Sequence, residues 1–170
     1  MNPSYFRVRI PLTDAMKRFG TWFGASELMA PTPVAFSEVV PLSCDENGQW
    51  RGLALYVYSN ACWTVFEDLT GAVASTPAAD WLGFSEADEF IYAGYNDAIG
   101  YGEFVHTRDA NILREYLYVE DDPSANIDRG YPSDTAVEPL TTWIEVARFV
   151  DDDELACSEK GLLWILGPGK

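Results

Sequence analysis

The chain has 170 residues, 48% of them hydrophobic and 14% aromatic, so it can bury a core of its own without disulfides or a structural metal. Its 27 acidic residues outnumber 11 Lys and Arg, and the formal net charge of −16 excludes nucleic acid and anionic membrane as natural partners. The three cysteines lack metal-site or disulfide spacing, no apolar run reaches the length of a membrane span, and the N-terminus lacks a signal-peptide pattern, so we expect a cytoplasmic single domain over residues 1–170 without a cofactor.

The first element that the sequence predicts is a helix within residues 11–30. Apolar side chains recur there at three- and four-residue steps, with Thr13 or Asp14 as the expected N-cap. The proline-rich stretch that follows favours an extended connection, in which residues 34–40 could form a short edge strand.

The middle of the chain predicts strands. Alternating residues over 49–71 indicate a β-hairpin that turns at Ser59 and Asn60. Residues 76–89 then favour a short helix, with Thr76 as the expected cap.

Three further strands are expected over about 90–95, 101–107 and 111–119, the last two joined by a turn. Together with the hairpin they would form an antiparallel meander. The fold class that follows is α+β, with a single antiparallel sheet of about five or six strands and two or three helices packed on one face.

The C-terminal part predicts a second clear helix within residues 137–154, with Thr141 as its expected cap. The run Asp151 to Glu154 has the wrong charge for a helix C-terminus, so we expect the helix to stop by Val150 unless these acids serve another purpose. Residues 161–169 are apolar and would form a final strand or a clasp.

The negative charge is distributed unevenly along the chain. Residues 1–51 contain five bases and five acids, so the whole excess of 16 acids lies after Arg51. From Gly52 to Thr107 there are eight acids and no Lys or Arg. Such a field attracts cations, basic peptides or basic proteins, although an acidic composition can also serve solubility alone.

The stretch "VEDDPSANIDRG" resembles the first half of a calcium-binding loop. Counting from Asp122, oxygen-bearing side chains stand at the first, third and fifth positions, as an EF-hand requires. Ile127, however, occupies the place of the obligatory glycine, and Ser133 the place of the closing glutamate. We therefore expect no metal here, but a solvated acidic loop or one that contacts a partner.

Catalytic motifs are absent from the sequence. The single histidine, His106, lies on an expected strand, and no serine, cysteine or zinc signature accompanies it. Paired carboxylates flanked by aromatics remain possible, as in a small glycosidase-like hydrolase, with candidates at Glu67, Asp68, Asp97 and Glu103. A cleft with two acids, at least one with a raised pKa, would distinguish that alternative from a binding protein.

Tyrosines interleave with acids in the part of the chain that lacks bases, and this combination is typical of an interface with a cationic protein. Strand alternation requires about half of these tyrosines to face the core. The expected partner-binding residues are Tyr95, Asp97, Tyr101, Glu103, Glu120, Asp121, Asp122, Asp128, Tyr131, Asp151, Asp152, Asp153 and Glu154.

With its segments "WTVFEDLTG", "YAGYNDA" and "REYLYVEDDP", the chain resembles, over roughly residues 50–150, the acidic bacterial immunity proteins of polymorphic and type VI secretion toxin systems. The resemblance is one of class and not of a defining motif. It implies a non-enzymatic protein that binds and neutralises a basic toxin domain, which in such systems is often a nuclease. An acidic regulatory or scaffold domain is the other non-catalytic alternative.

Overall fold

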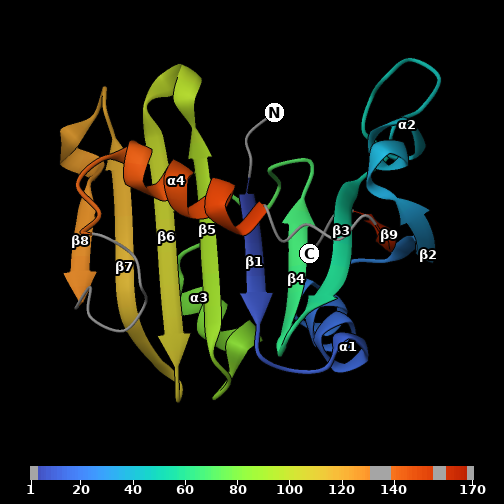
Figure 1. Cartoon of the computed structure of the whole chain (residues 1–170), viewed down its shortest axis with the longest axis horizontal. Helices are drawn as coiled ribbons and strands as arrows, with labels where there is room; N and C mark the ends of the chain where they lie inside the picture. The colour runs from blue at the N-terminus through green and yellow to red at the C-terminus, as the bar shows by residue number, and fades with distance from the viewer. Residues whose placement is uncertain (1–3, 131–138, 155–159, 168–170) are drawn as a thin grey trace.

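The computed structural model describes residues 4–130, 139–154 and 160–167. Nine strands form one sheet in the order β2-β9-β3-β4-β1-β5-β6-β7-β8, and every neighbouring pair is antiparallel (Figure 1). The strands are β1 (Ser4–Val8), β2 (Glu27–Ala35), β3 (Leu53–Asn60), β4 (Trp63–Asp68), β5 (Phe90–Asn96), β6 (Tyr101–Arg108), β7 (Asn111–Val119), β8 (Ile127–Gly130) and β9 (Lys160–Leu166). No helix within the described ranges is long and apolar enough to cross a membrane.

The α+β class and the antiparallel sheet are confirmed, but the expected five or six strands are too few. The meander β5–β6–β7 lies within one residue of its predicted bounds. The hairpin β3–β4 is shorter than the predicted 49–71, and it turns at Ala61 and Cys62 and not at Ser59 and Asn60, which still belong to β3. β1 and β8 were not expected, whereas β9 is the final strand that was one of two expectations for residues 161–169. The edge strand β2 lies before the expected 34–40, most of which is helical. β1 has only five residues and lies at the centre of the sheet, paired with β4 and β5, so its partners are more than fifty residues away in sequence.

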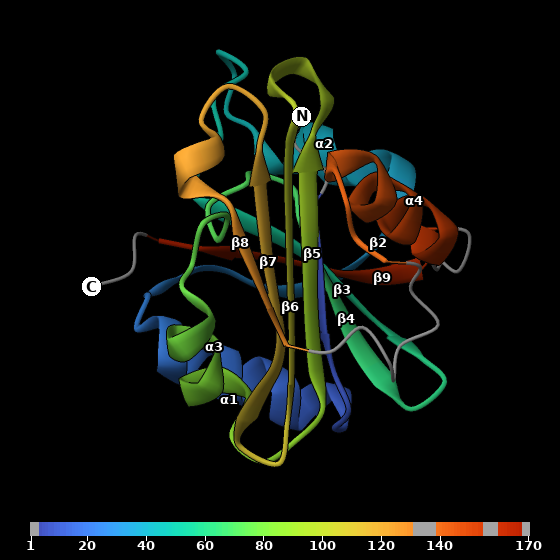
Figure 2. The same cartoon turned by 90° about the vertical axis from the view of Figure 1, so that its left-hand side faces the viewer.

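The helices cover both faces of the sheet, contrary to the expectation of one (Figure 2). The helices α1 (Leu12–Phe23) and α3 (Ala78–Ser85) pack on one face, whereas α4 (Trp143–Glu154) crosses the other, and the short α2 (Val39–Ser43) lies at the β2 end of the sheet (Figure 1). We call the two sides the α1/α3 face and the α4 face. Successive residues of a strand point to opposite faces of the sheet. Where helices cover both faces, both sets of residues are mostly apolar, and the alternation of apolar and polar residues is lost from the sequence.

The helix boundaries correct four expectations, three about caps and one about where a helix ends. Pro11 precedes α1 and supplies no side-chain cap, so neither Thr13 nor Asp14 is the N-cap. At α3 the preceding residue is Pro77 and not Thr76. The helix α4 continues to Glu154 and does not stop by Val150, and the residue that caps its start is Thr142, whose Oγ1 accepts from Ile144 N at 3.2 Å.

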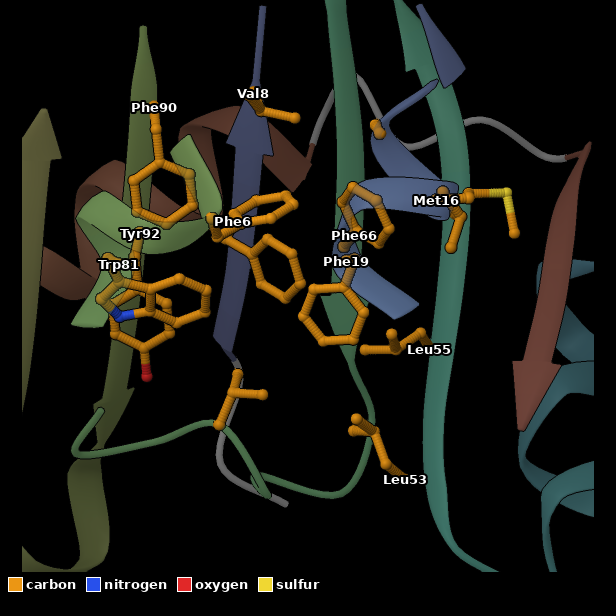
Figure 3. Close-up of a cluster of buried hydrophobic side chains, with 14 of the residues drawn as sticks. Phe6, Val8, Met16, Phe19, Leu53, Leu55, Phe66, Trp81, Phe90 and Tyr92 are labelled. Carbon is orange, nitrogen blue, oxygen red and sulfur yellow. The ribbon is translucent and has the colours of Figure 1, made fainter. Parts of the chain in front are cut away.

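A cluster of aromatic rings forms the core of the α1/α3 face (Figure 3). Phe6 lies at its centre, stacked on Phe66 with 4.7 Å between ring centroids and on Phe19 with 5.2 Å. Trp81 of α3 closes the cluster from outside at 5.2 Å from Phe6. All four side chains are fully buried, so close aromatic packing forms the centre of this face.

The α4 face has a different composition, because tyrosines and charged side chains share it with the aliphatic residues. In register across the sheet, Arg7 of β1, Ile91 of β5, His106 of β6 and Arg114 of β7 form one row. Phe149 of α4 packs beside this row, against Phe104 at 5.2 Å. The polar row and the aromatic cluster thus lie on opposite faces of the same strands.

Candidate functional site

The exposed acids predicted for partner binding meet at one end of strands β5, β6 and β7. Asp97 lies in the 3₁₀ turn η2 (Asp97–Ile99) between β5 and β6, and Glu120, Asp121 and Asp122 follow β7. The two segments lie side by side in both views (Figures 1 and 2), joined by the hydrogen bond from Glu120 N to Gly100 O at 3.0 Å. We call these four acids the acidic rim.

Local hydrogen bonds fix the shape of the rim. The Asn96 side chain accepts from Ala98 N at 3.0 Å and so starts η2. Gly100 follows with φ of 59°, and a Cβ at that position would lie 2.1 Å from Glu120 Oε2, so glycine allows the two segments to approach. The rim is therefore preorganised by its own backbone.

An apolar side chain stands among these acids. Ile99, in the η2 turn, is 54% exposed, and Ile144 in the first turn of α4 is exposed as well. Acids around a protruding aliphatic side chain make a surface that combines electrostatic attraction with a hydrophobic contact. The sequence prediction missed Ile99, although an apolar residue in a tight turn between two strands was a readable signal.

The oxygens of the calcium-like loop are occupied within the protein. Asp122 Oδ1 accepts from Ser124 N at 3.2 Å and caps the 3₁₀ turn η3 (Pro123–Ala125), and Asn126 Oδ1 accepts from Val119 N at 2.7 Å. Asp128 pairs with Arg114. In the described part of the chain no group of three or more His, Cys, Asp or Glu side chains is placed to hold a metal ion. Asp128 therefore belongs to an ion pair on the edge strand β8 and not to the rim.

The rim acids make no ion pair with any base in the described residues, in contrast to several acids elsewhere. Arg18 contacts Glu86 and Asp88, and Arg129 contacts Glu115. Because these bases lie against other acids, no base of the described residues neutralises the charge of Asp97 and Glu120 to Asp122.

The largest of these charge networks surrounds Glu89 at the other end of β5. Its carboxylate contacts Arg9 Nη1 at 3.0 Å, Arg108 Nη2 at 2.5 Å and His106 Nε2 at 3.3 Å. Burial opposes ionisation, but the hydrogen bond and charge of Arg108, helped by Arg9 and His106, hold the pKa of Glu89 below its usual value. His106 is buried within this network.

Glu103 must be removed from the predicted contact surface. Its carboxylate is only 7% exposed and lies on the α1/α3 face, where Ser75 N donates to Oε2 at 3.0 Å and the Tyr101 hydroxyl donates at 2.8 Å. Burial raises the pKa of Glu103, and it raises that of the Tyr101 hydroxyl beyond the range in which tyrosine ionises in solution. Glu103 thereby anchors the loop that carries Ser75, whose φ is 61°.

The second acid of the hydrolase alternative, Asp68, is also committed to the backbone. Its carboxylate accepts from Thr70 N at 2.9 Å, Gly71 N at 3.0 Å and Val73 N at 2.9 Å. Glu103 does have the raised pKa that would be expected in a catalytic carboxylate pair. Both carboxylates, however, accept hydrogen bonds from the backbone of the same loop, residues 70–75, and hold it in place. This arrangement indicates a structural role for the two carboxylates.

The remaining predicted residues lie away from the rim or outside the description. Tyr95 is half-buried under α4, where its hydroxyl donates to the exposed Asp151 at 3.2 Å, and Tyr101 is half-buried beside Glu103. Tyr131 lies outside the described residues, as do the side chains of Asp152, Asp153 and Glu154. Of the thirteen expected residues, the structure gathers four into one surface.

No known protein family, curated protein or solved structure matches this chain.

Proposed function

We propose that this protein is an inhibitor of the immunity type, which neutralises a basic toxin domain by binding it through the acidic rim. The observation that carries the proposal is the unpaired state of Asp97, Glu120, Asp121 and Asp122 among the described residues, on a preorganised surface with Ile99 exposed between them. The role proposed for the protein is binding and not catalysis.

Charge and shape would contribute to different steps of this association. The net charge of −16 steers a cationic partner toward the molecule, which raises the association rate and makes it sensitive to salt. Burial of Ile99 in an apolar pocket of the partner would instead slow dissociation. The rim pays little conformational entropy on binding, since its turns are already fixed by hydrogen bonds.

The test is co-expression with the basic domain encoded by a neighbouring gene, followed by kinetic binding measurements. The rim variant carries Asp97→Asn, Glu120→Gln and Asp121→Asn, none of which has a side-chain hydrogen bond to lose in the described structure. We expect the wild-type protein to protect cells and the rim variant to associate with the toxin about tenfold more slowly at low salt.

The matched control removes three exposed acids elsewhere, by Asp14→Asn, Asp80→Asn and Asp109→Asn. It changes the net charge by the same amount and should leave the association rate close to that of the wild type. Equal slowing in both triple variants would mean that overall charge and not the rim governs binding. Persistent toxicity and no complex with the wild-type protein would refute the proposal.

A further inference from the structure

A pocket opens where α1 and α3 lie side by side on the α1/α3 face (Figure 2). Its volume is about 520 Å³, within the range of small-molecule sites. The apolar part of its wall consists of Ile10, Pro11 and Trp22. The charged residues that line it are Asp14, Lys17, Arg18 and Glu86. The pocket therefore combines an apolar wall with charges of both signs.

Trp22 is a fixed part of this wall. Its indole ring stacks on Trp81 with 4.9 Å between ring centroids, and its Nε1 donates to Asp80 O at 3.1 Å. A Cβ at Gly83 would lie 3.3 Å from Nε1, so glycine allows the indole to lie close against α3. The ring is only partly buried, and a ligand that packs on it would find a surface that is already ordered.

Two of the four charges hold the helices of the pocket together. Arg18 Nη1 of α1 donates to Ser85 O at 3.1 Å and to Asp88 Oδ2 at 2.8 Å. Arg18 Nη2 contacts Glu86 Oε2 at 3.5 Å. The guanidinium thus joins α1 to the C-terminal end of α3, where the backbone N–H of Glu86 donates to Leu82 O. Arg18 and Glu86 therefore have a structural role in forming the pocket.

The other two charges, Asp14 and Lys17, have no side-chain partner among the described residues. Both are exposed and lie three residues apart on α1, so they are neighbours on the helix surface, with about 5–6 Å between Cβ atoms. Their side chains nevertheless form no ion pair with each other. Five arginines of the described residues contact an acid, so an unpaired lysine beside an unpaired carboxylate is an exception in this chain.

We infer that this pocket binds a free α-amino acid with a large apolar side chain. The ammonium group of the ligand would pair with Asp14 and its carboxylate with Lys17. The side chain of the ligand would pack against the indole ring of Trp22. Neighbouring charges of opposite sign fit a ligand whose own opposite charges are close together, and an α-amino acid carries both groups on one carbon atom.

The net charge of the protein favours such a zwitterion over an anion. A field of −16 repels anions, whereas a ligand with one charge of each sign has no net charge to be repelled. The pocket is itself balanced, with two acids and two bases. Ion pairs at exposed side chains contribute little each, so the apolar side chain of the ligand must supply much of the affinity. Binding should therefore require both charges and the apolar group.

The experiment is a heteronuclear NMR titration of the full chain with L-phenylalanine, following the indole N–H of Trp22 and the backbone N–H of Lys17. We expect saturable shifts of both signals with a dissociation constant of about 1 mM, as a ligand of this size allows. Phenylacetate and phenethylamine each lack one charge and should bind about fivefold more weakly. L-alanine lacks the large apolar group and should bind about tenfold more weakly or less tightly still.

Two variants test the residues. Asp14→Asn and Lys17→Gln should each weaken the binding of L-phenylalanine about fivefold, and both positions are exposed, so the variants should fold. The matched controls are Glu46→Gln and Arg148→Gln, which make the same changes of net charge at exposed positions that do not line the pocket. The controls should bind L-phenylalanine as the wild type does.

Several results would overturn the inference. One is the absence of saturable shifts at Trp22 and Lys17 at ligand concentrations far above the expected dissociation constant. Another is equal binding of phenylacetate, of phenethylamine or of the uncharged N-acetyl-phenylalanine amide, because the site would then recognise one charge or none. Unchanged binding in both Asp14→Asn and Lys17→Gln would also contradict it. The pocket does not include the acidic rim, so the rim variant should bind L-phenylalanine normally whether or not the proposed function is correct.

Discussion

The two faces of the sheet achieve burial by opposite chemistry. On the α1/α3 face, Phe6, Phe19 and Trp81 pack ring against ring, and the helices α1 and α3 cover them. On the α4 face, arginines, a histidine and tyrosines lie among the apolar side chains of the same strands, crossed by a single helix. The same strands therefore carry an apolar core on one side and a charge network on the other.

The two buried glutamates show what this difference does to a charge. Glu89 lies among Arg9, Arg108 and His106, and their charge and hydrogen bonds overcome burial and lower its pKa. Glu103, on the opposite face, accepts hydrogen bonds from Ser75 N and the Tyr101 hydroxyl and forms an ion pair with no base of the described residues, so burial raises its pKa. Arg9 and Arg108 are engaged by Glu89 and so are not available to neutralise the acids of the rim.

The largest effect should come from opening the aromatic cluster. Trp81→Ala removes the ring that closes the α1/α3 face and should lower the free energy of unfolding by about 4 kcal/mol. Phe149→Ala, on the α4 face, removes a half-buried ring and should cost about 2 kcal/mol. Urea denaturation measures the loss of stability of both variants. Equal losses would contradict the expected difference between the two faces.

A smaller loss should follow from removing the centre of the charge network. Glu89→Ala leaves Arg9, Arg108 and His106 close together without their shared carboxylate, and we expect a loss of about 3 kcal/mol, within the range for breaking a buried pair. Asp88→Ala is the matched control, since Asp88 pairs with Arg18 on a more exposed surface and should cost about 1 kcal/mol or less. Equal losses would mean that the network acts as an ordinary surface ion pair.

Local pattern was enough to predict the middle of the fold. Tight turns join β3 to β4, β5 to β6 and β6 to β7, so alternation and turn residues determine these pairings. The hairpin and the three-stranded meander do not join into one meander, because α3 separates β4 from β5 in sequence and β1 lies between them in the sheet. β1 could not be found this way, because five residues give too short a pattern and its partners are distant in sequence. A final strand was one of the two outcomes expected for residues 161–169, and β9 is that strand, but its place between β2 and β3 depends on packing over the whole chain.

The acidic surface was predictable in composition but not in detail. Asp97 and the run Glu120 to Asp122 lie in turns at the surface. They are exposed, as predicted from the sequence. Glu103 lies on a strand between Gly102 and Phe104, and only the position of the Ser75 loop determines that it is buried. Sequence spacing cannot show which loop covers a strand.

The smallest expected effect is the most specific comparison of the two faces, because its dependence on pH has the opposite sign on each face. A carboxyl whose pKa is raised by folding binds its proton more tightly in the folded state, so the stability contributed by Glu103 falls as pH rises from about 4.5 through its folded pKa. A carboxyl whose pKa is lowered does the opposite, and the contribution of Glu89 is lost as pH falls through its folded pKa. We therefore expect Glu103→Gln to gain stability relative to the wild type with rising pH, and the deficit of Glu89→Gln to shrink with falling pH.

Denaturant unfolding of the three proteins at several pH values measures these differences, and the wild type cancels the titration of the other acids. Glutamine keeps an acceptor for Ser75 N and the Tyr101 hydroxyl, so Glu103→Gln should fold normally. If both variants showed the same dependence on pH, the environment of the two glutamates would be alike, and the difference between the faces would be one of shape and not of electrostatics. Opposite slopes would establish that one sheet stabilises its buried acids by charge on the α4 face and by hydrogen bonds alone on the α1/α3 face.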